Sequence, residues 1–140
     1  MREKCVVMIV DDTPINLSIL AEILESKYDV VFASNVLDAL AKSKANIPDL
    51  ILLDIQMPDM NGYEVLKALK KMPALEKVPV IFLTTMSQQA DEAVGLKLGA
   101  VDYITKPISP ELVKLRVGTH IGIKLQREEL LKQQHMLAKK

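Results

Sequence analysis

Short apolar runs alternate with longer amphipathic stretches along most of this chain. The apolar runs, rich in Val, Ile and Leu, are Val6–Val10, Val30–Ala33, Leu50–Leu53, Val78–Leu83 and Val101–Thr105. Several are apolar throughout, as expected for strands that are covered on both faces. The alternation of such strands with helical patterns predicts an α/β fold in which repeated strand–helix units build a five-stranded parallel sheet.

The amphipathic stretches predict five helices, one after each strand. The first, Pro14–Ser26, repeats isoleucine every four residues and has proline at its first position, and either Thr13 or Asp12 is placed to cap it. The others are Val36–Lys44, Tyr63–Lys71, Gln88–Leu98 and a long helix that begins at Pro110. Gly99 follows the fourth helix, and glycine tolerates the left-handed conformation that is common at helix ends.

Polar residues stand at the ends of four of the five strands. Right-handed crossovers make the sheet open and doubly wound, and ligands bind such sheets outside the carboxyl ends of the strands. The residues found at these ends are Asp11, Asp12, Asp54, Thr84 and Lys106. A single aspartate at a strand end is often only a helix cap or turn former, so the joint placement of all five carries the prediction of one functional crevice.

Three carboxylates in one crevice need a cation. Each close pair repels by about 4 kcal/mol at an effective dielectric constant near 20, and a divalent ion relieves this cost. Oxygen ligands without histidine or thiol favour Mg²⁺, which binds carboxylates and phosphate together. The pattern therefore predicts phosphoryl chemistry with Asp54 as nucleophile, Lys106 neutralising charge and Thr84 donating a hydrogen bond.

Composition narrows the class of protein. The 140 residues suit one domain, and 18 basic residues balance 18 acidic ones, which argues against direct binding of nucleic acid or an anionic membrane surface. The single cysteine, Cys5, excludes an internal disulfide and is expected to pack in the core. No apolar stretch reaches the roughly 20 residues needed to span a bilayer, so we expect a soluble cytoplasmic protein.

Four motifs in order and spacing carry a family resemblance. They are Val-Asp-Asp at 10–12, Leu-Asp-Ile-Gln-Met-Pro-Asp-Met-Asn-Gly at 53–62, Thr84, and Asp-Tyr-Ile-Thr-Lys-Pro at 102–107. From about residue 5 to about residue 120 the chain resembles the receiver domain of two-component response regulators. The resemblance implies a flavodoxin-like sheet with strand order 2-1-3-4-5. It also implies that a sensor histidine kinase or a histidine phosphotransfer protein phosphorylates Asp54.

The same resemblance implies a metal site. Mg²⁺ would be held by Asp12, Asp54 and the backbone carbonyl of Gln56, with Asp11 acting through a bound water. Gln56 stands where aspartyl-phosphate hydrolases carry a second catalytic acid, so we expect no enzyme beyond the domain's own phosphoryl transfer and slow autodephosphorylation. A receiver-like interaction module without phosphorylation and a lone phosphate carrier remain alternatives.

The resemblance further implies a switch. Lys106 would contact the phosphoryl oxygens, the Lys106–Pro107 bond would be cis, and Thr84 would move toward the phosphate. The ring of Tyr103 would then rotate inward into the vacated space, although a static packing residue is the alternative. The fourth helix, fifth strand and fifth helix would change their surface and bind a partner or a second copy of the chain.

The C-terminal helix is longer than the fold needs. Its two apolar series are Val113, Val117, Ile121 and Leu125, every four residues, and Ile123, Leu130 and Leu137, every seven. The first series should pack on the sheet and the second should point elsewhere. We therefore predict a receiver domain over residues 1–122 and a helical extension over 123–140.

The extension has three interpretations: a dimeric coiled coil, a linker toward an output domain, or a frayed tail. The segment resembles the extension of receivers that precede output modules, including those of cyclic di-GMP metabolism. His120 and His135 lie on this helix, and we expect both to be solvated and without a carboxylate partner.

Overall fold

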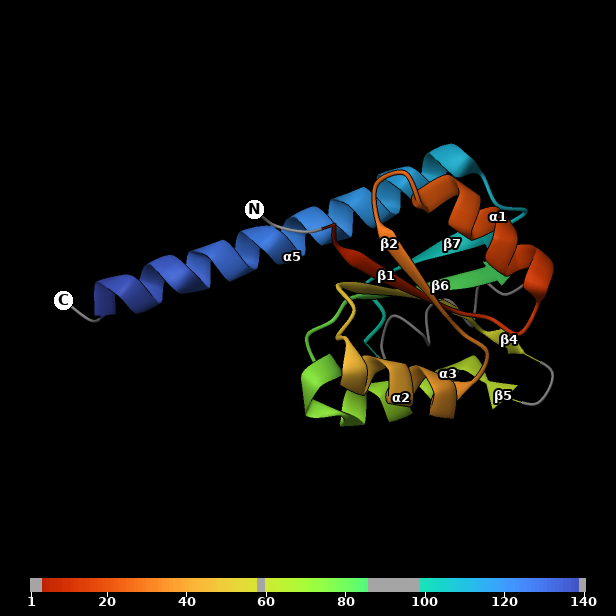
Figure 1. The fold of residues 1–140 in the computed structure, drawn as a ribbon, viewed down its shortest axis with the longest axis horizontal. Helices are drawn as coiled ribbons and strands as arrows, with labels where there is room; N and C mark the ends of the chain where they lie inside the picture. The colour runs from red at the N-terminus through yellow and green to blue at the C-terminus, as the bar shows by residue number, and fades with distance from the viewer. Residues whose placement is uncertain (1–3, 58–59, 86–98, 139–140) are drawn as a thin grey trace.

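The core of the fold is a five-stranded parallel sheet with strand order β2-β1-β3-β6-β7 (Figure 1). The computed structural model describes residues 4–57, 60–85 and 99–138. The strands of the sheet are β1 (Val6–Val10), β2 (Asp29–Ala33), β3 (Leu50–Asp54), β6 (Val80–Thr85) and β7 (Asp102–Lys106). Counted along the chain, this order is 2-1-3-4-5, and the prediction of a doubly wound α/β fold is confirmed.

Helices cover both faces of the sheet. Those described are α1 (Pro14–Leu24), α2 (Val36–Ala45), α3 (Gly62–Lys71) and α5 (Pro110–Ala138). Figure 1 shows α1 and the first part of α5 on one face and α2 and α3 on the other. The predicted helix Gln88–Leu98 lies outside the described residues. Gly99 has a positive φ of 116°, which favours glycine at that position.

Two helix starts differ in how they are capped. At α2 the Asn35 side chain accepts a hydrogen bond from the Asp38 amide at 2.8 Å, so the asparagine is a true cap. At α1 Thr13 occupies the cap position but makes no capping bond through its side chain. The Thr13 amide instead donates to Asp11 Oδ1 at 2.9 Å. Thr13, one of the two predicted caps, is therefore the cap residue by position but does not cap through its side chain, and Pro14 stands at the start of the helix as expected.

The side chains of the strands pack into two hydrophobic cores, one on each face of the sheet. Every residue of β1 and β3 is buried, which explains why their sequences are almost wholly apolar. Val7 and Ile9 pack beneath α1 and α5, whereas Met8 and Val10 pack against the α2 and α3 side. Cys5 is half-buried and packs against the first of these cores.

Three short elements were not predicted from the sequence. β4 (Gln56–Met57) and β5 (Met60–Asn61) form a two-residue antiparallel pair directly after the carboxyl end of β3. A single 3₁₀ turn, η1 (Pro73–Leu75), follows α3. The Lys70 ammonium donates to the backbone carbonyls of Leu75 and Glu76 at 3.4 and 3.1 Å, which ties the end of α3 to this turn.

Helix α5 is fixed to the body by an apolar and a polar row. The apolar row is the predicted one: Val113, Val117 and Ile121 are buried and Leu125 packs at the edge of the core. On the polar row, Lys124 pairs with Asp49 at 3.0 Å, just before β3. Beyond this pair the helix projects away from the sheet (Figure 1).

Helix α5 exposes its second apolar series toward its carboxyl end. Ile123, Leu130 and Leu137 are all exposed, as the seven-residue spacing predicted. Among the described residues, no helix has both the length and the apolar character that crossing a bilayer requires.

Candidate functional site

The predicted site residues meet at the carboxyl edge of the sheet. Asp11 directly follows β1, Asp54 is the last residue of β3, and Lys106 is the last residue of β7. Thr84 lies one residue before the end of β6 and is fully buried. Parallel pairing of these neighbouring strands places all four residues at one edge.

Three carboxylates form the floor of this site. One oxygen each from Asp11, Asp12 and Asp54 lies within 4.8 Å of the others. Asp11 is fully buried, Asp54 is 2% exposed, and Asp12 is open to solvent. Two of the three charges are therefore shielded from water while the third faces the entrance.

The Asp11 carboxylate is incompletely satisfied. Its Oδ1 accepts the Thr13 amide, whereas the buried Oδ2 has no hydrogen-bond partner within the described part of the chain. Burial raises the pKa of Asp11, and the nearby charge of Asp54 raises it further, although hydrogen bonds from Thr13 and Asn16 and the charge of Lys106 oppose the shift. A buried carboxylate oxygen without a donor is a position that a cation would fill, and an all-oxygen set fits Mg²⁺.

Lys106 supplies the positive charge of the site. Its Nζ lies 3.2 Å from Asp54 Oδ1, and its side chain is 20% exposed. The bond between Lys106 and Pro107 is cis. Among the residues that the structure describes, three carboxylates thus face the Lys106 ammonium group, and this imbalance is the electrostatic reason to expect a divalent cation.

Two further predicted residues lie close by. Gln56 begins β4, two residues after Asp54, so its backbone is at the edge of the site. Tyr103 lies in β7 opposite Phe82 of β6, half-buried at the rim of the sheet. Its ring lies within 5.8 Å of the Arg116 guanidinium, measured from the ring centroid to the guanidinium carbon.

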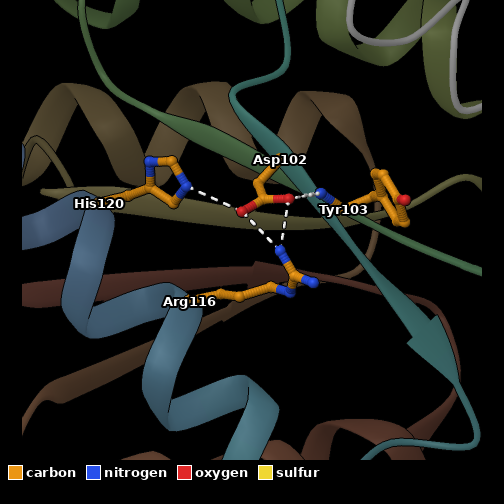
Figure 2. A network of polar contacts seen from close by, with 4 residues as sticks. All are labelled: Asp102, Tyr103, Arg116 and His120. Carbon is orange, nitrogen blue, oxygen red and sulfur yellow. Dashed lines mark hydrogen bonds and ion pairs between the residues drawn. The ribbon is translucent and has the colours of Figure 1, made fainter.

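The expectation for His120 was wrong. Its Nε2 lies 3.0 Å from Asp102 Oδ2, and its side chain is only 16% exposed (Figure 2). Arg116, one helical turn earlier, bonds the same carboxylate. His135 is exposed, as expected. The one available signal was spacing, since Arg116, His120 and Lys124 recur every four residues beside the buried row of α5.

The partners of Asp102 set its ionisation. Burial alone would raise the pKa of Asp102, but hydrogen bonds from His120, from the Tyr103 amide and from Arg116 outweigh burial. These bonds and the Arg116 charge hold the pKa of Asp102 below its ordinary value. The carboxylate is therefore kept ionised next to the half-buried tyrosine.

Comparison with known proteins agrees with this geometry. The sequence model described as the response regulator receiver domain matches residues 7–117. Protein PilH of Pseudomonas aeruginosa is 38% identical over 106 residues, which cover 75% of this chain and 88% of PilH. The solved structure of the chemotaxis response regulator CheY4 of Vibrio cholerae has a TM-score of 0.77 at 28% identity, covering 84% of this chain and 99% of CheY4.

A longer relative is also similar. A probable cyclic di-GMP phosphodiesterase of Vibrio cholerae is 43% identical over 134 residues, which cover 96% of this chain and 30% of that protein. The chain spans less than half the length of several curated relatives that it matches. The match to the family model and the similarity over most of PilH show that the chain belongs to the receiver domains of two-component response regulators.

Proposed function

We propose that this receiver domain is a switch that accepts a phosphoryl group on Asp54. The observation that supports it most directly is the crevice itself, in which three carboxylates lie within 4.8 Å of one another and Lys106 lies 3.2 Å from Asp54. The donor would be a phosphohistidine of a sensor kinase or a phosphotransfer protein, the partners with which receiver domains interact.

In the transfer, one Asp54 oxygen attacks the phosphorus atom. A P–O bond forms as the P–N bond of the donor breaks, and the imidazole nitrogen keeps the electron pair. Lys106 balances charge on the phosphoryl oxygens, and the buried Thr84 hydroxyl donates a hydrogen bond to one of them. Because Asp54 and Thr84 are already shielded from water, these interactions act in a medium of low dielectric constant.

We further propose that Mg²⁺ is the cofactor. Asp12, Asp54 and the Gln56 carbonyl would hold it, with Asp11 acting through a bound water and offering its unsatisfied Oδ2. When bound, the ion neutralises charge on the transferred phosphoryl group. Receiver domains are in general signalling modules and not enzymes, and with Gln56 in place of a second acid we expect the phosphoaspartate to be lost slowly.

Phosphorylation would change the surface at the β7 edge of the sheet and at α5. We propose that Thr84 moves toward the phosphate and that Tyr103 follows inward, changing the surface made by β7, α5 and the predicted helix 88–98. The changed surface, or the exposed apolar series of α5, would pair with a second copy. Residues 1–122 would be the receiver and 123–140 the signalling extension.

The similarity to the longer Vibrio relative supports a link to an output domain. A match over 134 of 140 residues must include most of residues 123–140, so the extension is shared with a protein described as a probable cyclic di-GMP phosphodiesterase. We therefore favour the interpretation of α5 as the connection to an output domain, with cyclic di-GMP metabolism as its field of action.

The proposal is tested with acetyl phosphate and Mg²⁺. The wild type should gain the mass of one phosphoryl group, labile to hydroxylamine and mapped to Asp54, and Asp54→Asn should gain none. Asp29→Asn, which alters an exposed aspartate at the opposite end of the sheet, is the matched control and should be modified like the wild type. An unmodified wild type, or equal modification of Asp54→Asn, would contradict the assignment.

A further inference from the structure

The Asp102 carboxylate ties the edge strand β7 to α5. Arg116 Nη1 donates to both of its oxygens, at 2.8 and 2.9 Å, and the Tyr103 amide donates to Oδ1 at 2.8 Å. His120 Nε2 completes the group at 3.0 Å from Oδ2 (Figure 2). With the side chain of Asp102 only 21% exposed, most of its hydrogen-bonding capacity is used within the protein.

Arg116 has a second contact, on the ring of Tyr103. Its guanidinium carbon lies 5.8 Å from the ring centroid, inside the range of cation–π attraction. Its Nε is buried and has no hydrogen-bond partner among the residues that the structure describes. An unconstrained guanidinium would turn to hydrate that nitrogen, so the orientation is set by Asp102 on one side and by the ring on the other.

We propose that Arg116 is a positioning residue for Tyr103, with Asp102 and His120 holding the guanidinium in place. The contact stabilises the half-buried ring position at the sheet rim and therefore opposes inward rotation. This inference rests on the proposed switch role of Tyr103. It adds that the threshold of the switch is set from α5 and not only from the phosphorylation pocket.

The coupling between the Tyr103 ring and α5 should act in both directions. Arg116 and His120 are one turn apart on α5, and Val113 and Val117 of the same segment are buried in the core, so this part of the helix packs directly against the sheet. When the Tyr103 ring leaves the rim of the sheet, Arg116 loses its contact with the ring and is held by Asp102 alone. A partner that shifts α5 would equally change the energy of the ring position, since coupling between two sites acts in both directions.

The test follows the Tyr103 ring by NMR with ring-labelled tyrosine. Tyr28 and Tyr63 serve as internal references, and beryllofluoride with Mg²⁺ serves as the phosphoryl mimic. Arg116→Gln should shift the Tyr103 signals without the mimic and lower the beryllofluoride concentration at half response by about two- to fivefold, the factor that corresponds to a cation–π contact at a partly exposed site. Arg116→Lys, which keeps a cation, should lie between Arg116→Gln and the wild type.

Two comparisons separate positioning from general stability. Arg127→Gln, an exposed arginine later on α5, should leave the half-response concentration unchanged. Asp102→Asn should act in the same direction as Arg116→Gln, and the double variant should not add the two effects, because both act through one guanidinium. A lowered melting temperature with unchanged Tyr103 signals and unchanged half-response would overturn the proposal.

The same experiment separates the switch role of Tyr103 from the positioning role of Arg116. If the wild-type Tyr103 signals do not respond to beryllofluoride, the switch role of the tyrosine fails and the positioning role fails with it. If they respond, but Arg116→Gln and the wild type respond at the same concentration, only the positioning role fails. Phosphorylation of Asp54 would stand in either case, because it is measured by the acetyl phosphate adduct.

Discussion

Replacing Asp54 by asparagine should stabilise the domain when Mg²⁺ is absent, and the geometry of the site gives the size of the effect. At an effective dielectric constant near 20, Asp11 within 4.8 Å of Asp54 contributes a repulsion of at least about 3.5 kcal/mol. The exposed Asp12 adds about 1 kcal/mol at the dielectric constant of water. Lys106 at 3.2 Å contributes an attraction of about 5 kcal/mol.

The repulsions and the attraction therefore nearly cancel, so the cost of burying the Asp54 charge decides whether the substitution stabilises the domain. The Asp54 side chain is 2% exposed, so its ionised form has lost most of its hydration, a cost of several kcal/mol for a buried charge. Asparagine has nearly the same shape and no charge, but it gives up the ion pair with Lys106. We expect a net gain of about 1 kcal/mol in the free energy of unfolding, or about 3 °C in melting temperature for a chain of this size.

The assay is urea and thermal denaturation in a chelator and in saturating Mg²⁺. The metal at 100 times its dissociation constant should add about 2.7 kcal/mol to the wild type and much less to Asp54→Asn, so the order of stability reverses. Asp29→Asn should stay within about 0.5 kcal/mol of the wild type in both conditions. A variant that is equal to or less stable than the wild type in chelator would refute the idea of a strained, buried carboxylate cluster.

Two other predictions concern α5. Because the pKa of Asp102 is lower in the folded protein than its ordinary value of 3.8, its contribution to stability is present above that value and is lost as the pH falls through the folded pKa. The stability difference between the wild type and Asp102→Asn, from urea unfolding, should thus be largest near neutral pH and shrink below about pH 4; a constant difference would contradict this sign. Beryllofluoride should promote dimerisation in sedimentation experiments and Leu130→Glu on the exposed series should abolish it, whereas a monomer in every state at high concentration would exclude a role of α5 in pairing.

The sheet could be predicted from the sequence because strands such as β1 and β3, buried on both faces, appear as nearly continuous apolar runs. β1 was predicted to the residue, and β3 to within one, since each is a run of apolar residues ended by an aspartate. β6 was placed two residues early because Val78 and Pro79 are apolar but precede the first ladder pairs. Periodicity reports burial, whereas strand ends are set by hydrogen bonds that it does not report.

The carboxylate site was also predictable, and for a topological reason. Parallel strands bring their carboxyl ends to one edge, so residues far apart in the chain could be gathered by the fold class alone. No rule of this kind predicts the cluster of Asp102, Arg116 and His120. Its members face one another across a strand and a helix, and each by itself reads as an ordinary charged surface residue. They meet because of the way α5 packs on the sheet.

The packing of α5 also decides which movements the helix can transmit. The polar row of α5 is held at two places, at Asp102 through Arg116 and His120 and at Asp49 through Lys124. Asp49 directly precedes β3, a five-residue strand about 17 Å long whose other end is Asp54. A buried strand paired on both sides is stiff, so the Lys124 contact is a fixed point of the helix. The contact at Arg116 adjoins a residue that we propose to move, so a change at Asp54 should reach α5 at Arg116 and turn the projecting part of the helix about the fixed point at Lys124.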